Sequence, residues 1–127
     1  MRKKIVLDTN FLMIPGEFMV DIFEDFKRVC EFPFELCTTK GVLRELSRLS
    51  REGNIRQRTA ARIGLALAKT KDLKIIDVEA TEASDVDNSL VELAKKGCLI
   101  ATQDRLLQKR LGSFVYLRQK KYLKIKA

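Results

Sequence analysis

Four acidic residues of this chain occupy positions from which they could share one site: Asp8, Glu45, Asp87 and Asp104. Asp8 directly follows the apolar run 5–7, and Asp104 comes two residues after the mostly apolar run 98–102. Short apolar runs of this kind are typical of buried parallel strands. Acids at the carboxyl ends of such strands lie at the edge where open α/β sheets bind their ligands. Each of the two could instead only cap the helix that follows it, as short polar residues often do.

Glu45 lies within the apolar stripe of a helix for which Thr39 is a suitable N-cap. It comes three residues after Val42 and four before Leu49. This spacing turns the carboxylate toward the core, where its burial costs free energy unless a cation or a hydrogen bond compensates. The alternative is an ion pair with Arg48, three residues further along, at the edge of the stripe.

Asp87 has a comparable position on the helix that Ser84 is expected to open. It comes three residues before Leu90 and four before Val91, which places it on the buried stripe. Asp85 lies on a different face of this helix and is a second candidate for the third acid. The alternative is a capping-box variant of Ser84 and Asp87, in which both acids only favour the helix N-terminus.

The residue types that the chain lacks restrict its chemistry. There is no histidine, which excludes a Ser–His or Cys–His catalytic pair. The three cysteines have no C-x-x-C spacing, which argues against zinc and favours buried free thiols: Cys30, Cys37 and Cys98. Sites built from carboxylates alone select hard cations such as Mg²⁺ or Mn²⁺. Such ions activate water for attack on a phosphodiester, and they would relieve the repulsion among four unpaired carboxylates.

Apolar periodicity and turn residues predict the elements that position these acids. Strands are expected at 4–7, 34–38, 74–78, 98–102 and 114–117, and helices at 17–31, between 39 and 53, at 55–69, from 84 to 97, and at 105–111. In the helix 55–69 the residues expected to face inward are Ile63, Leu65, Ala66 and Leu67. The alternation of strands and helices predicts an α/β fold, in which a parallel sheet carries helices on both faces.

At 127 residues the chain is expected to form one domain, residues 1–117, followed by a basic C-terminal tail, residues 118–127. No run approaches the length of a membrane span, and the N-terminus lacks the apolar block of a signal peptide. A cytoplasmic protein without membrane contact is therefore expected.

The net charge of +8 is concentrated at one end of the chain. Residues 1–104 carry 17 basic and 17 acidic side chains, whereas residues 105–127 carry eight basic side chains and no acid. A basic surface favours nucleic acid through counterion release. The helices between 39 and 53 and at 55–69 are also rich in arginine, which is well suited to bind phosphates: Arg44, Arg48, Arg51, Arg56, Arg58 and Arg62. The alternative is ordinary solvated helix faces and a tail that aids solubility. The candidate RNA-binding residues are Arg44, Arg48, Arg105, Lys120, Lys121 and Lys124.

Four stretches together resemble the PIN-domain nucleases, and the resemblance covers nearly the whole chain. They are Leu7-Asp8-Thr9-Asn10, Val42-Leu43-Arg44-Glu45-Leu46, residues 87–94 and residues 100–105. The resemblance implies a PIN-like three-layer α/β/α sandwich with a parallel five-stranded sheet of order 3-2-1-4-5. It places the family's four metal-site acids on Asp8, Glu45, Asp87 and Asp104, and its polar helpers on Asn10 and Thr102. It also implies Mg²⁺- or Mn²⁺-dependent cleavage of RNA, often by homodimers.

Several roles are compatible with that resemblance. The ending Val115-Tyr116-Leu117-Arg118, followed by lysines, is similar to the branch associated with ribosomal-RNA processing in archaea and eukaryotes, which implies a pre-ribosomal particle as partner. The chain is also short enough to be the toxin ribonuclease of a VapC-type pair, with an antitoxin as partner. A non-catalytic RNA-binding scaffold is the alternative of a different class. A receiver or phosphatase is less favoured, because Asp8-Thr9-Asn10 lacks the Asp-x-Asp of one such phosphatase family.

Overall fold

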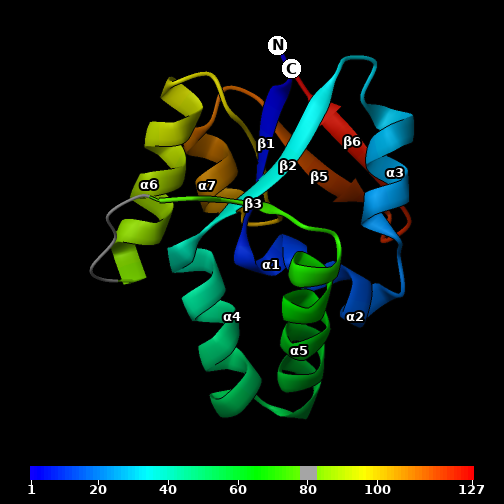
Figure 1. The fold of residues 1–127 in the computed structure, drawn as a ribbon, viewed down its shortest axis with the longest axis vertical. Coiled ribbons are helices and arrows are strands. Elements are labelled where there is room, and N and C mark those ends of the chain that lie inside the picture. Colours follow the sequence, from blue (N-terminus) through cyan, green and yellow to red (C-terminus); the bar gives the residue numbers. More distant parts are fainter. Residues whose placement is uncertain (78–82) are drawn as a thin grey trace.

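The computed structural model describes residues 1–77 and 83–127, without the side chains of residues 83–85. Within these residues the strands form one six-stranded sheet in the order β3-β2-β1-β4-β5-β6 (Figure 1). The strands are β1 (Lys3–Leu7), β2 (Phe34–Thr39), β3 (Lys74–Ile76), β4 (Leu99–Ala101), β5 (Phe114–Arg118) and β6 (Tyr122–Lys126). The first five pair in parallel, and β6 pairs antiparallel with β5. The predicted α/β class and the order 3-2-1-4-5 are confirmed.

Helices flank this sheet on both sides. Helix α6 (Ala83–Lys95) packs on β4 and α3 (Ile22–Val29) packs on β6, and Figure 1 shows these helices on opposite sides of the sheet. Helices α4 (Lys40–Glu52) and α5 (Ile55–Thr70) pack on each other beyond the carboxyl end of β2, at the bottom of Figure 1. The other helices of the described residues are short: α1 (Thr9–Leu12), α2 (Ile14–Phe18) and α7 (Arg105–Arg110). None of the described helices combines the length and apolarity needed to cross a membrane.

Strand β1 runs through the centre of the core. Its first residues, Lys3 and Lys4, are exposed, whereas Ile5–Leu7 are fully buried because the sheet is covered on both faces there. The chain then reaches Asp8, of which only 5% is exposed. The sequence of β1 therefore delivers a carboxylate to the buried carboxyl end of the central strand. Cys30 and Cys37 are buried free thiols, as predicted, whereas the free thiol of Cys98 is only half-buried.

The segment 118–127, predicted to be a basic tail, contains a strand of the sheet. Leu123 of β6 is fully buried. Its backbone N–H donates to Asp25 Oδ2 at 2.6 Å, and its carbonyl accepts from Arg28 Nη2 at 2.8 Å. Asp25 and Arg28 both lie on α3, so this helix provides hydrogen-bond partners for the backbone groups of Leu123 on the edge of β6 that does not face β5. The prediction of a tail beyond the fold was therefore wrong for residues 122–126.

The turn between β5 and β6 explains why the sixth strand escaped prediction. Gln119 and Lys120 have φ angles of 55° and 56°, which is the left-handed region that usually calls for glycine or asparagine. Neither residue type is present, so the sequence has no hairpin signal at this position. The alternation of Leu123 and Ile125 with lysines was the one available sign of a strand.

The helix predicted at 17–31 is divided into two. Helix α2 ends at Phe18, Met19 adopts the left-handed region with a φ of 56°, and α3 begins after its N-cap Asp21. A left-handed residue cannot continue a right-handed helix. The apolar periodicity runs through this break, and for that reason it predicted one continuous helix.

Helix α5 buries small side chains instead of the large ones that were expected. The fully or nearly fully buried positions are Ala60, Ala61, Gly64 and Ala68, whereas Ile63 is 38% exposed. A Cβ atom at Gly64 would stand 2.6 Å from the carbonyl oxygen of Leu12. Because α5 lies so close to α1, only the smallest residues fit between them.

Replacing Gly64 by Ala is expected to lower the free energy of unfolding by about 2 kcal/mol. The clash of the added Cβ atom with the backbone of Leu12 should destabilise the fold by more than the higher helix propensity of alanine stabilises it. Urea unfolding would measure the change. Gly112→Ala is the matched control, since a Cβ atom there would meet nothing within 4 Å. Equal stability of the two variants would show that α1 and α5 can separate without cost.

Candidate active site

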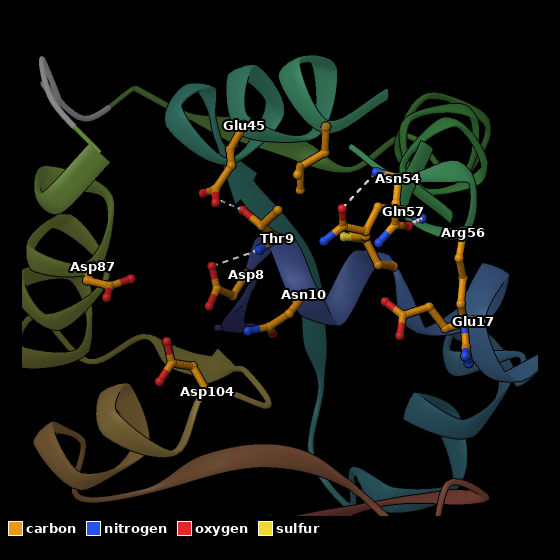
Figure 2. A pocket seen from close by; sticks show the side chains of 12 residues that line it. Asp8, Thr9, Asn10, Glu17, Glu45, Asn54, Arg56, Gln57, Asp87 and Asp104 are labelled. Atoms are coloured by element: carbon orange, nitrogen blue, oxygen red, sulfur yellow. Dashed lines mark hydrogen bonds between the residues drawn. The ribbon is translucent and has the colours of Figure 1, made fainter. Parts of the chain in front are cut away.

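The carboxyl end of β1 opens into a cleft of about 440 Å³ that all four predicted acids line. Figure 2 shows Glu45 reaching into it from α4, Asp87 from α6 and Asp104 from the start of α7, with Asp8 between them. The full lining among the described residues is Asp8, Thr9, Asn10, Met13, Glu17, Glu45, Leu49, Asn54, Arg56, Gln57, Asp87 and Asp104. The prediction that the four acids share one cleft is confirmed. Their chemical role stays a prediction.

The carboxylate of Asp8 is held from two directions. Its Oδ1 accepts from the backbone N–H of Thr9 at 2.7 Å, and its Oδ2 accepts from the Thr102 hydroxyl at 2.8 Å. Burial raises the pKa of Asp8 to about 6, against the lowering effect of these two hydrogen bonds. The nearby charges of Asp87 and Glu45 raise this pKa further. In the absence of a cation, Asp8 is thus a carboxylate whose charge the surroundings disfavour.

Glu45 is tied to the chain segment that follows Asp8. Its Oε2 accepts from the hydroxyl of Thr9 at 3.0 Å, and Thr9 itself is buried. The alternative ion pair with Arg48 is not found among the described residues. Thr9 therefore connects the two acids, because its backbone binds Asp8 and its side chain binds Glu45.

Asp104 combines the capping role and the cleft position that the sequence left open. Its Oδ1 accepts from the backbone N–H groups of Leu106 and Leu107 at 2.9 and 3.1 Å, which caps α7. Its own backbone N–H donates to the Thr102 hydroxyl at 3.1 Å. That hydroxyl also donates to Asp8, so Thr102 fixes the two strand-end acids relative to each other.

Asp87 lies on the face of α6 that looks toward the cleft. Burial raises its pKa, and the charges of Asp104 and Glu45 add to this, while Arg110 lowers the pKa. Arg110 Nη2 donates to the side chain of the neighbouring Asn88 at 2.8 Å, which holds a cation near this acid. The side chain of Asp85 lies outside the described residues, so the choice between Asp85 and Asp87 as third acid rests on the position of Asp87 in the cleft.

Asn10, the second predicted polar helper, lines the cleft next to the acids (Figure 2). Its Oδ1 accepts from the backbone N–H of Gln103 at 3.1 Å. This bond joins α1 to the segment between β4 and α7. Asn10 therefore helps to hold the two strand ends in register.

The donor set of the cleft fits a hard divalent cation. Among the described residues, Glu45 Oε1, Asp104 Oδ2 and both oxygens of Asp87 accept no hydrogen bond, which leaves them available as ligands. In the side-chain arrangement present, no three His, Cys, Asp or Glu residues of the described chain form a group that could hold an ion. A metal would have to draw the carboxylates together or bind some of them through water.

The predicted RNA-binding residues lie outside the cleft as far as its lining is described. All six of their side chains belong to exposed residues: Arg44, Arg48, Arg105, Lys120, Lys121 and Lys124. Lys120 Nζ lies 5.6 Å from the centroid of the Phe18 ring. These residues are distributed over α4, the start of α7 and the β5–β6 hairpin, and their role stays a prediction.

Sequence reasoning did not place the other end of the cleft, which Glu17, Asn54, Arg56 and Gln57 line. Arg56 was predicted only as one of six arginines suited to phosphates. Asn54 and Gln57 form a capping box at the start of α5. The Asn-x-x-Gln spacing was a readable signal for this helix start. Its closeness to Asp8 was not readable, because it depends on the packing of α5 against α1 and α2.

A mostly parallel sheet with helices on both sides, whose central strand ends at a cleft of acids, defines the chain as an α/β protein. The chain belongs to the family of PIN-like domains, since the model of that family, described as "PIN like domain", matches residues 5–120. It is 30% identical over 128 residues to Ribonuclease VapC4 of Methanocaldococcus jannaschii, a match that covers 96% of this chain and 95% of that protein.

Two solved structures show the same fold. The PIN domain endonuclease Utp24 superposes with a TM-score of 0.74 at 21% identity, covering 97% of this chain and 90% of the other. A domain of a protein of unknown function from Methanocaldococcus jannaschii gives a TM-score of 0.53 at 18% identity, covering 84% and 82% of the two chains. At these identities the likeness concerns the fold alone.

Proposed function

We propose that this chain is a metal-dependent endoribonuclease that hydrolyses RNA phosphodiester bonds, with Mg²⁺ or Mn²⁺ held by Asp8, Glu45, Asp87 and Asp104. The observation that carries the proposal is the convergence of these four acids on one cleft at the end of the central strand. The name of the relative that is 30% identical over nearly the whole chain supports RNA as the substrate.

The residues around the acids would prepare them for this role. Thr102 and the backbone of Thr9 fix both oxygens of Asp8, while the start of α7 fixes one oxygen of Asp104. The oxygens of Glu45, Asp87 and Asp104 that accept no hydrogen bond would bind the cation, together with Asp8, whose oxygens each keep a second lone pair. When bound, the cation would supply an activated water and stabilise the charge that develops on the phosphate.

The direct test uses the purified protein, a 5′-labelled single-stranded RNA and Mn²⁺, with EDTA as control. Endonucleolytic fragments that form with Mn²⁺ and not with EDTA are the expected result. RNA binding without cleavage under any divalent cation would favour the non-catalytic scaffold. The RNA target and the partners, whether a second copy, an antitoxin or a pre-ribosomal particle, stay predictions.

The exposed lysines near the C-terminus are expected to contribute to RNA binding. We would change Lys120, Lys121, Lys124 and Lys126 together to Ala and plot the logarithm of the RNA-binding constant against the logarithm of the salt concentration. The slope of this plot should become shallower by roughly 0.7 for each phosphate that is no longer bound. Cleavage at saturating RNA should change much less. The matched control removes four exposed lysines elsewhere: Lys27, Lys69, Lys95 and Lys96. Equal slopes for the two quadruple variants would exclude the hairpin and point to the arginines of residues 44–62.

A further inference from the structure

The cleft that contains the four acids continues to the start of α5, where its character changes. At this end it is lined by Asn54, Arg56 and Gln57, with Glu17 opposite (Figure 2). The side chains of Met13 and Leu49 also line the cleft and give it an apolar surface. A single strand of RNA whose scissile phosphate lies at the acids would therefore find different chemistry further along the same cleft.

The two carboxamides at this end present hydrogen-bond donors. Asn54 Oδ1 accepts from the backbone N–H of Gln57 at 2.8 Å, and Gln57 Oε1 accepts from that of Asn54 at 3.0 Å. Since both oxygens are used inside the chain, the groups left for a ligand are Asn54 Nδ2 and Gln57 Nε2, which can only donate. Neither nitrogen donates to another residue in the described part of the chain.

Arg56 adds a positive charge at this end of the cleft. It is exposed, and no carboxylate of the described residues lies within 4 Å of it. Among the described residues that line the cleft it is the one cation, whereas the lining includes five carboxylates. A guanidinium fork beside amide donors matches the oxygens of a phosphate.

We propose that Arg56, with the carboxamides of Asn54 and Gln57, binds a phosphate that flanks the scissile one on the same RNA strand. These residues would position the substrate and take no part in the chemical step. The inference rests on the proposed ribonuclease function. It adds that the two ends of the cleft differ in role, with acids that would bind the metal at one end and hydrogen-bond donors that would bind a phosphate at the other. Glu17 is the one carboxylate that would oppose a phosphate at the donor end.

The first test compares Arg56→Ala with Lys69→Ala, an exposed cation of the same helix that does not line the cleft. Removing one charged group that binds a phosphate should raise KM for single-stranded RNA about tenfold and leave kcat within about twofold. In the Asp8→Asn background with EDTA, binding of fluorescein-labelled RNA should weaken similarly, with a salt slope flatter by roughly 0.7.

A second variant removes a donor without disturbing the helix. Gln57→Glu keeps an oxygen to accept from the Asn54 N–H, because glutamate serves equally in a capping box, but it replaces the amide nitrogen by an acceptor. The thermal midpoint should be unchanged or higher, while RNA binding should weaken about tenfold or more. Thr70→Glu, which adds the same charge at the exposed far end of α5, should bind nearly as the wild type does.

The third variant predicts the opposite sign. Glu17→Gln removes the carboxylate that faces the donors, so RNA should bind several times more tightly. If the wild type neither binds nor cleaves RNA, the proposed function fails. If it cleaves RNA while Arg56→Ala behaves as Lys69→Ala and Glu17→Gln does not tighten binding, the function stands and this inference is overturned.

Discussion

Replacing Asp8 by Asn is expected to reduce Mn²⁺-dependent RNA cleavage by about a thousandfold or more, since one charged ligand at the centre of the site is lost. The change is small in shape. The side-chain oxygen that remains can still accept from the backbone N–H of Thr9, so the start of α1 should persist. Initial rates of fragment formation from labelled RNA would measure the loss.

The matched control for this variant is Asp72→Asn, an exposed residue in the turn before β3. Asp72 has a φ of 53°, a conformation that asparagine tolerates equally well, so neither fold nor cleavage should change. Circular dichroism would verify that both variants are folded. Full cleavage by the Asp8→Asn variant, in preparations free of other nucleases, would refute the catalytic role of the four acids.

The candidate site was predictable from sequence because each of its acids has a local signature. Asp8 and Asp104 follow buried strands, and the same position also makes them helix N-caps. Capping and a place in the cleft are therefore compatible, while the role of these acids in the site stays a prediction. Glu45 and Asp87 were found from helical phase, which depends only on spacing to apolar neighbours. In a parallel sheet the carboxyl ends of the strands and the starts of the helices that follow them lie at the same edge, so the four acids come together there.

What sequence could not supply depends on packing between distant elements. The inward face of α5 was assigned by side-chain size, whereas the close approach of Leu12 to Gly64 reverses that order. Lys120 in its left-handed turn has no residue-type signal. The position of Arg56 in the cleft follows from α5 lying beside α1 and α2, which no local pattern encodes.

The metal-free protein is expected to lose stability from Asp8 as the pH rises from about 4 to about 7. The pKa of this carboxyl is about 6 in the folded chain against 3.8 ordinarily, so the folded state binds the proton more tightly. The stability that the proton on Asp8 contributes to the fold is fully present below pH 3.8 and is lost as the pH rises through about 6. The shift corresponds to about 3 kcal/mol. The raised pKa of Asp87 acts in the same direction.

Other carboxyl groups act in the opposite direction, so the difference between two proteins is the useful measurement. The hydrogen bond from Arg28 lowers the pKa of Asp25. The ionised Asp25 therefore stabilises the fold at pH values above its ordinary pKa, and this stabilisation is lost as the pH falls through the lowered pKa. The contributions of these other carboxyl groups are the same in the wild type and in Asp8→Asn, so they cancel in the difference between the two unfolding free energies. In EDTA the urea-unfolding free energy of Asp8→Asn should be close to that of the wild type near pH 4 and higher by about 2–3 kcal/mol near pH 7.

Divalent cation should reverse that order. Mn²⁺ bound by the folded wild type adds stability that grows with its concentration relative to the dissociation constant, and it is bound best when Asp8 is ionised. The gain for the wild type should therefore be larger at pH 7 than at pH 5, and Asp8→Asn should gain much less at either pH. A constant difference between the two proteins from pH 4 to pH 7, with or without Mn²⁺, would mean that Asp8 carries neither the proton nor the metal assigned to it.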